Sequence, residues 1–285
     1  MSAPVVSVSP VVLGERELRV SAPTTGSDLP VLLFSHGFGS SSRAYGPLVD
    51  WWAAHGFVVV APTHLDSRTL GLADDDPRRR SFWRHRVDDM RRVLDHLDVV
   101  EAAVPGLAGR VDHDRVVAAG HSFGGQTTGV LLGLRVDGED LADPRVTAGV
   151  LLATAGRGGD ALRPGVIEMF PWLAPDFSAM KAPALVVMGD ADSSALSTRG
   201  PDWSADPYLL SPPGKSLLTL VGGEHSLGGI PGYEAAETTD EDPARVAALQ
   251  RLTTAYLRTA LDADDPAWLE AATALPASVG RVESR

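Results

Sequence analysis

Cysteine is absent from the 285 residues of this chain. Its absence excludes disulfide bonds, a thiolate nucleophile and cysteine metal ligands, and it fits a cytoplasmic protein. Long apolar runs are missing too, because none approaches the roughly 18 residues that span a bilayer. The first ten residues, MSAPVVSVSP, lack the basic stretch and apolar core of a secretory signal. We therefore expect a cytoplasmic location and no membrane partner.

Positive charge is also in short supply. The chain has 25 Lys and Arg against 37 Asp and Glu, and its formal net charge is −12. This balance disfavours binding to nucleic acid or to anionic membranes. The His and Asp residues do not form a spaced set of metal ligands, so we expect no metal and no organic cofactor. The expected partner is a small molecule, and the sequence does not indicate the oligomeric state.

Short apolar, β-branched runs alternate with amphipathic stretches along the whole chain, without an internal repeat or a low-complexity linker. This alternation predicts a single α/β domain over residues 1–285, with a mostly parallel sheet and helices on both faces. The predicted strands are two within Val5–Val20, then Val31–Ser35, Phe57–Pro62, Arg115–Gly120, Gly149–Thr154, Ala184–Gly189 and Ser216–Val221. The predicted helices are Ser42–His55, Phe82–Glu101, Gln126–Leu134, Pro243–Leu261 and a short one around Pro266–Ala274.

The segment Ala155–Lys181 fits neither the helical nor the strand period. It is rich in Gly and Pro, and it contains Met169, Phe170, Trp172 and Phe177. A long irregular stretch inside a compact domain is often functional. We predict a lid over about residues 155–182; the alternative is a surface loop that its aromatic side chains anchor.

A candidate nucleophile lies in Gly120-His121-Ser122-Phe123-Gly124, which matches G-x-S-x-G. The pattern alone is weak, but the preceding run is a predicted strand and the following residues suit a helix, as this motif requires. Ser122 at the tip of such a turn has a strained backbone, and small residues two positions before and after it keep the crossing chains apart. The helix N-terminus adds positive dipole and a free backbone N–H. We therefore predict that Ser122 is a catalytic nucleophile.

A candidate oxyanion hole follows from Ser35-His36-Gly37-Phe38-Gly39, directly after an early buried strand. In this architecture that loop faces the nucleophile turn, so the backbone N–H groups of Phe38 and Phe123 are predicted to point at one spot. Backbone donors of this kind contribute about 3–4 kcal/mol each to the stabilisation of the transition state. We interpret His36 as a residue that holds the loop, because the base is better supplied elsewhere.

The candidate base is His225, the only one of the eight histidines that follows the last predicted strand. That is its place in the chain order Ser, acid, His. For the acid we prefer Asp192, which lies three residues past the end of a predicted strand. Asp190 is the alternative and Asp160 a distant third. Glu224 is a poor candidate, because the ring of the next residue cannot easily turn back onto it.

The chain resembles α/β-hydrolases of the dienelactone hydrolase, platelet-activating-factor acetylhydrolase and chlorophyllase group, with cutinase-like polyester hydrolases as relatives. The resemblance extends over about residues 28–260. It rests on LLFSHGFGSS (Leu32–Ser41), FVVVAP with Thr63-His64, AAGHSFGG (Ala118–Gly125), PALVVMGDAD (Pro183–Asp192) and GGEHS (Gly222–Ser226). It implies the α/β-hydrolase fold with an eight-stranded, mostly parallel sheet, and a cofactor-free esterase.

The chain departs from this group at the acid. The resemblance to chlorophyllases and the acetylhydrolases implies a catalytic acid just after the strand that follows the nucleophile helix. At that place this chain has Ala153-Thr154-Ala155-Gly156 and no carboxylate. The acid thus lies one strand later, as in cutinase-like and dienelactone-type enzymes, which counts against a chlorophyll or phospholipid substrate. Dienelactone hydrolases use a cysteine nucleophile, which this chain lacks.

Together these patterns predict a serine hydrolase that cleaves esters of a small to medium apolar molecule through an acyl-enzyme. Four aromatic residues near the expected site are candidates for substrate binding: Phe38, Phe123, Phe170 and Trp172. Trp203 is a further aromatic residue near it. A lactonase, thioesterase or amidase would use the same three catalytic residues. From another class, the alternative is a catalytically silent protein that binds a small apolar ligand.

Overall fold

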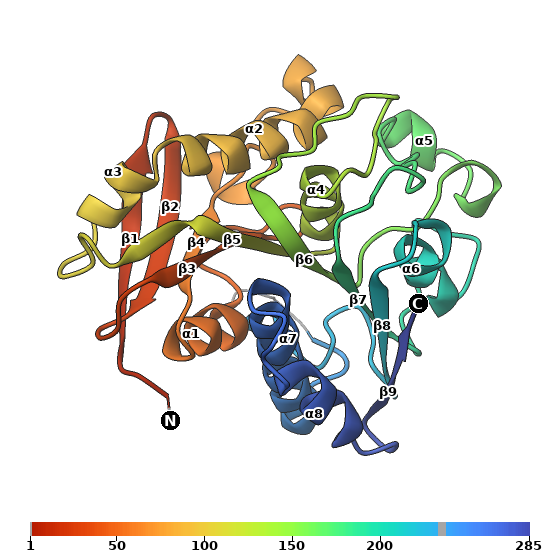
Figure 1. Cartoon of the computed structure of the whole chain (residues 1–285). Coiled ribbons are helices and arrows are strands. Elements are labelled where there is room, and N and C mark those ends of the chain that lie inside the picture. Colours follow the sequence, from red (N-terminus) through yellow and green to blue (C-terminus); the bar gives the residue numbers. More distant parts are fainter. Residues whose placement is uncertain (1, 233–237) are drawn as a thin grey trace.

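The computed structural model describes residues 2–232 and 238–285, and these form one nine-stranded sheet flanked by helices (Figure 1). In space the strands follow the order β1-β2-β4-β3-β5-β6-β7-β8-β9. Their bounds are β1 Val5–Leu13, β2 Arg16–Pro23, β3 Leu29–Ser35, β4 Val58–Pro62, β5 Val111–His121, β6 Val146–Leu152, β7 Ala184–Gly189, β8 Lys215–Leu220 and β9 Gly280–Ser284.

The middle of the sheet is parallel and both its edges are antiparallel. Strands β4, β3, β5, β6, β7 and β8 pair in parallel, whereas β2 pairs antiparallel with both β1 and β4, and β9 pairs antiparallel with β8. The continuous apolar runs form the central strands, because a parallel sheet is covered on both faces. All residues of β4, β7 and β8 are buried.

Helices cover both faces of the sheet (Figure 1). One hydrophobic core joins α2, α3 and α4 to one face, and a second core joins α1 and α7 to the other. The α-helices are α1 Gly46–Ala54, α2 Phe82–Asp95, α3 Leu97–Ala102, α4 Phe123–Leu131, α5 Val166–Met169, α6 Asp206–Leu210, α7 Pro243–Leu261 and α8 Ala267–Thr273. None of the helices in the described residues is long and apolar enough to cross a membrane.

Apart from shifts of a few residues at the ends of elements, two expectations differ from the structure. The sheet has nine strands instead of eight, because residues 280–284 add β9 at the edge beside β8. The sequence of β9, GRVES, is short and mostly exposed, so it lacks the apolar pattern of a strand. The helix expected over Phe82–Glu101 is divided at His96. The Nδ1–H of His96 donates to the carbonyl of Arg92 at 2.9 Å and thereby replaces the backbone bond that would continue the helix.

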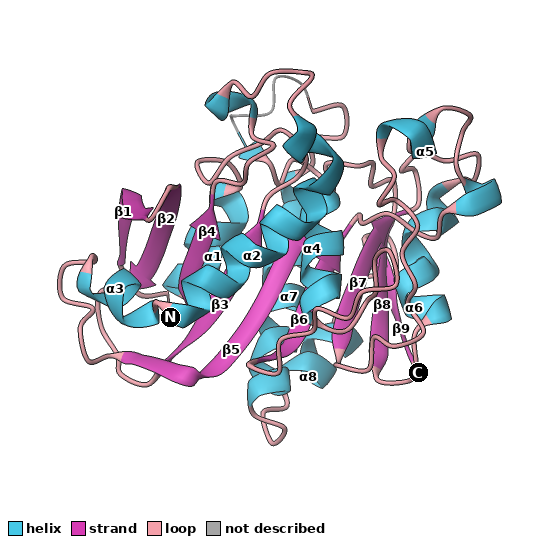
Figure 2. Ribbon diagram, turned by 90° about the horizontal axis from the view of Figure 1, so that it is seen from above, coloured by secondary structure: helices cyan, strands magenta, loops and turns pink. Residues whose placement is uncertain are grey.

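The loops after β3, β5, β7 and β8 leave the sheet at the edge formed by the carboxyl ends of the parallel strands, the usual place for a binding site in an open α/β sheet. In Figure 2, α5 lies beyond the strand ends at the upper right. Between β6 and β7 the chain is irregular, with only a 3₁₀ turn at Gly159–Ala161 and the one-turn helix α5 as described elements. This agrees with the absence of a period in the sequence.

Candidate active site

Ser122 lies in a sharp turn between β5, which ends at His121, and α4, which begins at Phe123. Its backbone angles are φ 56° and ψ −119°, a strained conformation for a residue with a side chain. The flanking glycines leave no room for a Cβ atom. A Cβ on Gly120 would lie 2.1 Å from the carbonyl oxygen of Gly124, and one on Gly124 would lie 1.9 Å from that of Ser35. The strand, the turn and the neighbouring strand β3 thus cross in contact beneath Ser122.

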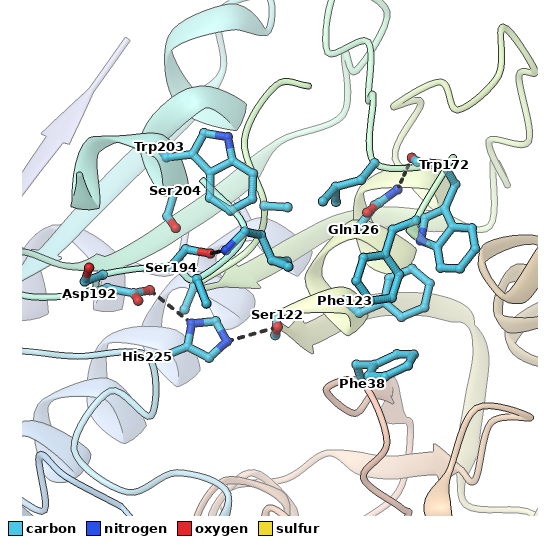
Figure 3. Close-up of a pocket in the computed structure, with 17 residues that line it drawn as sticks. Phe38, Ser122, Phe123, Gln126, Trp172, Asp192, Ser194, Trp203, Ser204 and His225 are labelled. Atoms are coloured by element: carbon cyan, nitrogen blue, oxygen red, sulfur yellow. Dashed lines mark hydrogen bonds and ion pairs between the residues drawn. The ribbon is translucent and has the colours of Figure 1, made fainter. Parts of the chain in front are cut away.

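The side chains of Ser122, His225 and Asp192 form one hydrogen-bonded chain (Figure 3). His225 Nε2 lies 3.0 Å from Ser122 Oγ, and His225 Nδ1 lies 3.1 Å from Asp192 Oδ2. Asp192 is buried, whereas half of the His225 side chain is exposed. A buried carboxylate at Nδ1 orients the ring and leaves Nε2 facing the hydroxyl, as a general base requires. The structure brings these three predicted residues together, and their catalytic roles remain predictions.

The two alternative acids lie elsewhere. Asp190 is exposed, and its Oδ1 accepts a hydrogen bond from the backbone N–H of Gly222 at 2.7 Å, which holds the two strand ends together. Asp160 is exposed in a 3₁₀ turn after β6. The carboxylate that contacts His225 therefore follows β7 and not β6. This geometry supports the departure from the chlorophyllase pattern that the sequence indicated, in which the acid lies one strand later.

The loop His36–Gly39 lies directly against the nucleophile turn. A Cβ on Gly37 would be 3.7 Å from the Cβ of Ser122. The amides on either side of Phe38 are occupied, because the Gly37 N–H donates to Tyr45 Oη at 3.0 Å and the Gly39 N–H donates to Asp66 Oδ2 at 3.0 Å. The Phe38 N–H donates to no acceptor within the described part of the chain. It is therefore available to an oxyanion.

The second predicted donor, the N–H of Phe123, belongs to the first residue of α4. The first N–H groups of a helix have no intrahelical acceptor, so this one is available as well. The helix begins at this point and adds its positive dipole end. Both predicted donors thus come from the two loops that meet at Ser122, and the oxyanion hole itself remains a prediction.

His36 is buried and bonded at both ring nitrogens. Its Nδ1–H donates to the carbonyl of Gly37 at 2.7 Å, and its Nε2 accepts from the backbone N–H of His64 at 3.0 Å. These partners require the neutral ring. Burial, followed by the nearby Arg86 guanidinium, holds the pKa of His36 well below its usual range. His36 therefore supports the loop, in agreement with the interpretation from the sequence.

His121, next to the nucleophile, connects the two loops of the site. Its Nε2–H donates to the backbone carbonyl of His225 at 2.8 Å, and its Nδ1 accepts from the Tyr45 hydroxyl at 2.9 Å. Burial lowers the pKa of His121 to about 3 and raises that of Tyr45 to about 12. Both groups are therefore neutral and fixed in one hydrogen-bond direction, from the Gly37 amide through Tyr45 and His121 to the loop of His225.

Ser122 and His225 open onto a pocket of about 380 Å³. All four predicted substrate-binding residues, Phe38, Phe123, Phe170 and Trp172, line it. Their rings are in mutual contact, with centroid distances of 6.2 Å for Phe38–Phe123, 5.6 Å for Phe123–Trp172, and 5.7 Å for both Phe170–Trp172 and Phe38–Phe170. Trp203 lies across the pocket from them (Figure 3). The pocket is suited to an apolar group.

The predicted lid segment forms one wall of this pocket. Phe170, Trp172 and Leu173 line it, whereas Phe177 is buried in the core beside α2 and α4 and Met169 is 68% exposed. Both interpretations of the segment thus describe part of it, since some of its aromatic rings face the site and one anchors the chain. Its movement as a lid remains a prediction.

Two residues beneath the oxyanion loop were not selected from the sequence. Asp66 belongs to the polar stretch Thr63–Arg80 between β4 and α2, yet its side chain is fully buried against Arg86. For Arg86, the helical periodicity of the sequence does indicate burial. Arg86 precedes Met90 by four residues and Val93 by seven, so it lies on the buried face of α2.

In the described part of the chain, no group of three or more His, Asp and Glu side chains could hold a metal ion.

Comparison with known proteins finds several enzymes that the chain resembles in part. The chlorophyllase family model matches residues 3–142. A platelet-activating factor acetylhydrolase from Bos taurus is 29% identical over 36% of this chain and 32% of its own length. A putative non-heme haloperoxidase of Mycobacterium phage D29 is 35% identical over 48% of this chain and 40% of its own length. Cutinase 2 of Thermobifida cellulosilytica is 26% identical over 73% of this chain and 65% of its own length.

The sheet order, the strained serine between β5 and α4, and these matches together show that the chain has the fold of the α/β-hydrolase superfamily. Within it, the chain is similar to the group of chlorophyllases, platelet-activating factor acetylhydrolases and cutinases, which confirms the resemblance seen in the sequence. The matched part spans less than two thirds of each of these relatives.

Proposed function

We propose that this protein is a carboxylic ester hydrolase with Ser122 as its nucleophile. The observation that carries the proposal is the hydrogen-bonded chain from Asp192 through His225 to Ser122, which opens onto an apolar pocket. A serine hydroxyl is a poor nucleophile unless a base takes its proton. The similarity to proteins named acetylhydrolase and cutinase supports the same chemistry.

The reaction proceeds in two steps. His225 Nε2 takes the proton of Ser122 Oγ as this oxygen bonds to the ester carbonyl carbon, and the N–H groups of Phe38 and Phe123 stabilise the oxyanion. The carbon–oxygen bond to the alcohol then breaks, and His225 protonates the leaving oxygen. Water repeats the sequence on the acyl-enzyme and releases the acid. Asp192 keeps the proton on Nδ1 of neutral His225 and stabilises its cation.

The pocket supports an uncharged substrate of small to medium size. Its volume is about 380 Å³, within the range of small-molecule sites, and its lining includes no Lys or Arg among the described residues. Aromatic and aliphatic side chains form most of it, so an apolar acyl or alcohol group would gain from burial. We therefore propose apolar esters as the substrate class. Lactones, thioesters and amides present the same carbonyl chemistry and belong in the test panel.

Hydrolysis of p-nitrophenyl esters of increasing acyl length, by the wild type beside Ser122→Ala, tests the proposal. We expect turnover in the wild type and a kcat at least about 10³-fold lower in the variant. The three catalytic residues act as a unit, so removal of one of them abolishes most of the catalysis that depends on all three. Turnover that survives the substitution would refute the role of Ser122. Ligand binding without turnover in the wild type would instead favour the silent binding protein.

The two carboxylates after β7 provide a matched pair in the same assay. Asp192→Asn should reduce kcat by about 10⁴-fold, as the loss of the carboxylate behind a catalytic histidine does in comparable sites. Asp190→Asn should leave kcat within a few-fold, because this exposed side chain contacts only the Gly222 amide. The reverse pattern would transfer the acid role to Asp190.

A further inference from the structure

We propose that Arg86, assisted by Asp66, is a positioning residue of the oxyanion hole, which fixes the Gly37–Phe38 peptide so that the Phe38 N–H faces the reacting carbonyl oxygen. The inference rests on the proposed function and deepens it. Neither residue lines the pocket, so each acts through the residues that supply the two donors. The pair is fully buried directly behind that loop.

Every N–H of the Arg86 guanidinium has an acceptor. Nε and Nη2 bind the two oxygens of Asp66, both at 2.7 Å, in a bidentate ion pair. Nη1 donates to the carbonyl of His36 at 2.6 Å and to Ser35 Oγ at 3.3 Å, and Nη2 donates to the carbonyl of Gly37 at 3.2 Å. A guanidinium has five donors in one plane, and here the loop and Asp66 occupy all five.

The bond to the Gly37 carbonyl bears directly on the oxyanion hole. This carbonyl and the N–H of Phe38 belong to the same peptide unit, and in a trans peptide the two groups point in opposite directions. Anchoring the oxygen on Arg86 therefore turns the N–H of Phe38 away from Arg86. In the proposed arrangement the freed N–H faces the reacting carbonyl beside Ser122. The Gly37 backbone borders this residue, since a Cβ on Gly37 would lie 3.7 Å from the Cβ of Ser122.

The same carbonyl accepts a second hydrogen bond, from His36 Nδ1–H at 2.7 Å. Two donors on one carbonyl, one of them cationic, polarise the peptide and strengthen its N–H as a donor. His36 Nε2 accepts from the His64 amide, so the neutral ring has its one proton on Nδ1 and donates it to the Gly37 carbonyl. The peptide is thus oriented and polarised from the side opposite to the substrate.

Asp66 and the Arg86 ring contact extend this control to both sides of the hole. Asp66 Oδ2 accepts the N–H of Gly39, so the pair holds the loop before and after Phe38. The Arg86 guanidinium carbon also lies 4.3 Å from the centre of the Phe123 ring. At this distance a cation–π interaction helps to hold Phe123, whose N–H is the second predicted donor. One buried ion pair therefore fixes the positions of the two predicted donors relative to each other.

A purely structural role is the competing explanation, and Arg110 offers a matched control. Its guanidinium donates to three backbone carbonyls, those of Gly26, Gly106 and Pro23, whereas that of Arg86 donates to two. Arg110 lies just before β5, at the opposite end of that strand from Ser122. Arg110→Lys should disturb a comparable set of hydrogen bonds far from the site. An effect on catalysis specific to Arg86 therefore separates positioning from general stability.

The test compares the wild type, Arg86→Lys, Arg86→Met and Arg110→Lys on the p-nitrophenyl ester that the wild type cleaves fastest. Each is measured for kcat, KM, the midpoint of urea unfolding and inhibition by a trifluoromethyl ketone, which forms an oxyanion on the nucleophile. Lysine keeps the charge beside Asp66 but has three donors instead of five. We expect Arg86→Lys to fold, to lose about 10- to 100-fold in kcat with KM within twofold, and to lose ketone affinity by a similar factor.

Arg86→Met should lose at least as much kcat as Arg86→Lys, with a lower unfolding midpoint, whereas Arg110→Lys should keep the wild-type kcat. Asp66→Asn is the second variant, since its amide oxygen still accepts from Gly39, and a smaller loss of kcat is expected. Wild-type kcat and ketone affinity in Arg86→Lys, or equal losses in Arg110→Lys, would overturn the inference. If the wild type shows no turnover that depends on Ser122, the proposed function fails first and the inference fails with it.

Discussion

The pocket has two walls that differ in how they are held. The catalytic wall, formed by the loop His36–Gly39 and the nucleophile turn Gly120–Gly125, rests on a buried ion pair and neutral buried histidines. The outer wall is formed by residues 155–173 and 193–204. It rests on a small apolar cluster, on backbone hydrogen bonds such as that from the Arg163 amide to the Leu196 carbonyl, and on the partly exposed ion pair of Arg199 with Asp206.

The difference between the two walls separates the chemistry of the site from its substrate selectivity. Buried polar groups tolerate few alternative arrangements, because an unpaired partner is costly in a low-dielectric interior. Apolar contacts accept changes of shape at lower cost. The catalytic wall is therefore suited to hold hydrogen-bond donors at fixed positions, and the outer wall is suited to change the size of the pocket.

The largest expected effect comes from Gly124→Ala on the catalytic wall. The added Cβ would lie 1.9 Å from the Ser35 carbonyl oxygen, and both are backbone positions that cannot move alone. We expect a loss of folding stability of about 3 kcal/mol or more and of nearly all ester turnover. Urea unfolding and initial rates measure the two effects.

Gly200→Ala is the control on the outer wall. Its Cβ would meet the Asp202 side chain at 3.7 Å, an ordinary contact, and its φ is −77°. Stability within about 0.5 kcal/mol of the wild type is expected. Equal losses in the two variants would remove the distinction between the walls.

Acid should weaken the protein through the catalytic wall. Burial is the first cause that lowers the pKa of His36, His64 and His121, so these rings stay neutral when folded and take up protons on unfolding. Below the unfolded pKa of about 6.5, each ring lowers the free energy of unfolding by up to about 1.4 kcal/mol per pH unit. We expect unfolding midpoints in urea to be flat from pH 8 to 7 and to fall steeply from pH 6 to 5.

Hydrogen exchange at pH 7 and 5 locates this loss of stability. Amides around His36–Gly39 should lose protection at a pH where those around Leu162–Val166 of the outer wall keep theirs, after correction for the intrinsic exchange rate. A urea midpoint that is constant down to pH 5 would contradict the assignment of the three histidines as buried and neutral.

The smallest effect is expected from Phe170→Ala on the outer wall. Phe170 is partly buried and contacts Phe38 and Trp172 edge to face, so its removal enlarges the pocket without opening the core. We expect the ratio of kcat/KM for octanoate over acetate esters to rise about 10-fold, since pocket contacts of this size are worth 1–3 kcal/mol. Ile167→Ala, in the helix α5 that ends just before Phe170 but outside the pocket lining, should leave the ratio unchanged.

The sequence predicts the elements whose signal is local. Strands β3, β4 and β7 are continuous apolar runs, and α7 occupies the range Pro243–Leu261 that its periodic stripe indicated. The serine turn was found because a strand and a helix flank its motif. Asp192 was selected by its distance from a strand end, and the structure brings it to His225.

The features that the sequence does not predict depend on contacts between distant segments. The edge strand β9 is polar, and its pairing with β8 becomes visible only when the sheet is formed. Asp66 and Arg86 are 20 positions apart in the sequence. Each is a charged residue of the kind usually found on the surface, and each is buried here because the other neutralises its charge. A charge on a buried helical face is the local sign of such a pair, but its partner is set by the tertiary fold.

Phe38 belongs to both walls at once. Its backbone is part of the loop anchored beneath the catalytic wall, and its ring contacts Phe170 of the outer wall. The catalytic wall and the outer wall can acquire mutations largely independently elsewhere, but a substitution at this position alters reactivity and substrate choice together. Position 38 is thus where the evolution of a new specificity is constrained by the preservation of rate, and where two substitutions, one on each wall, should show the strongest epistasis.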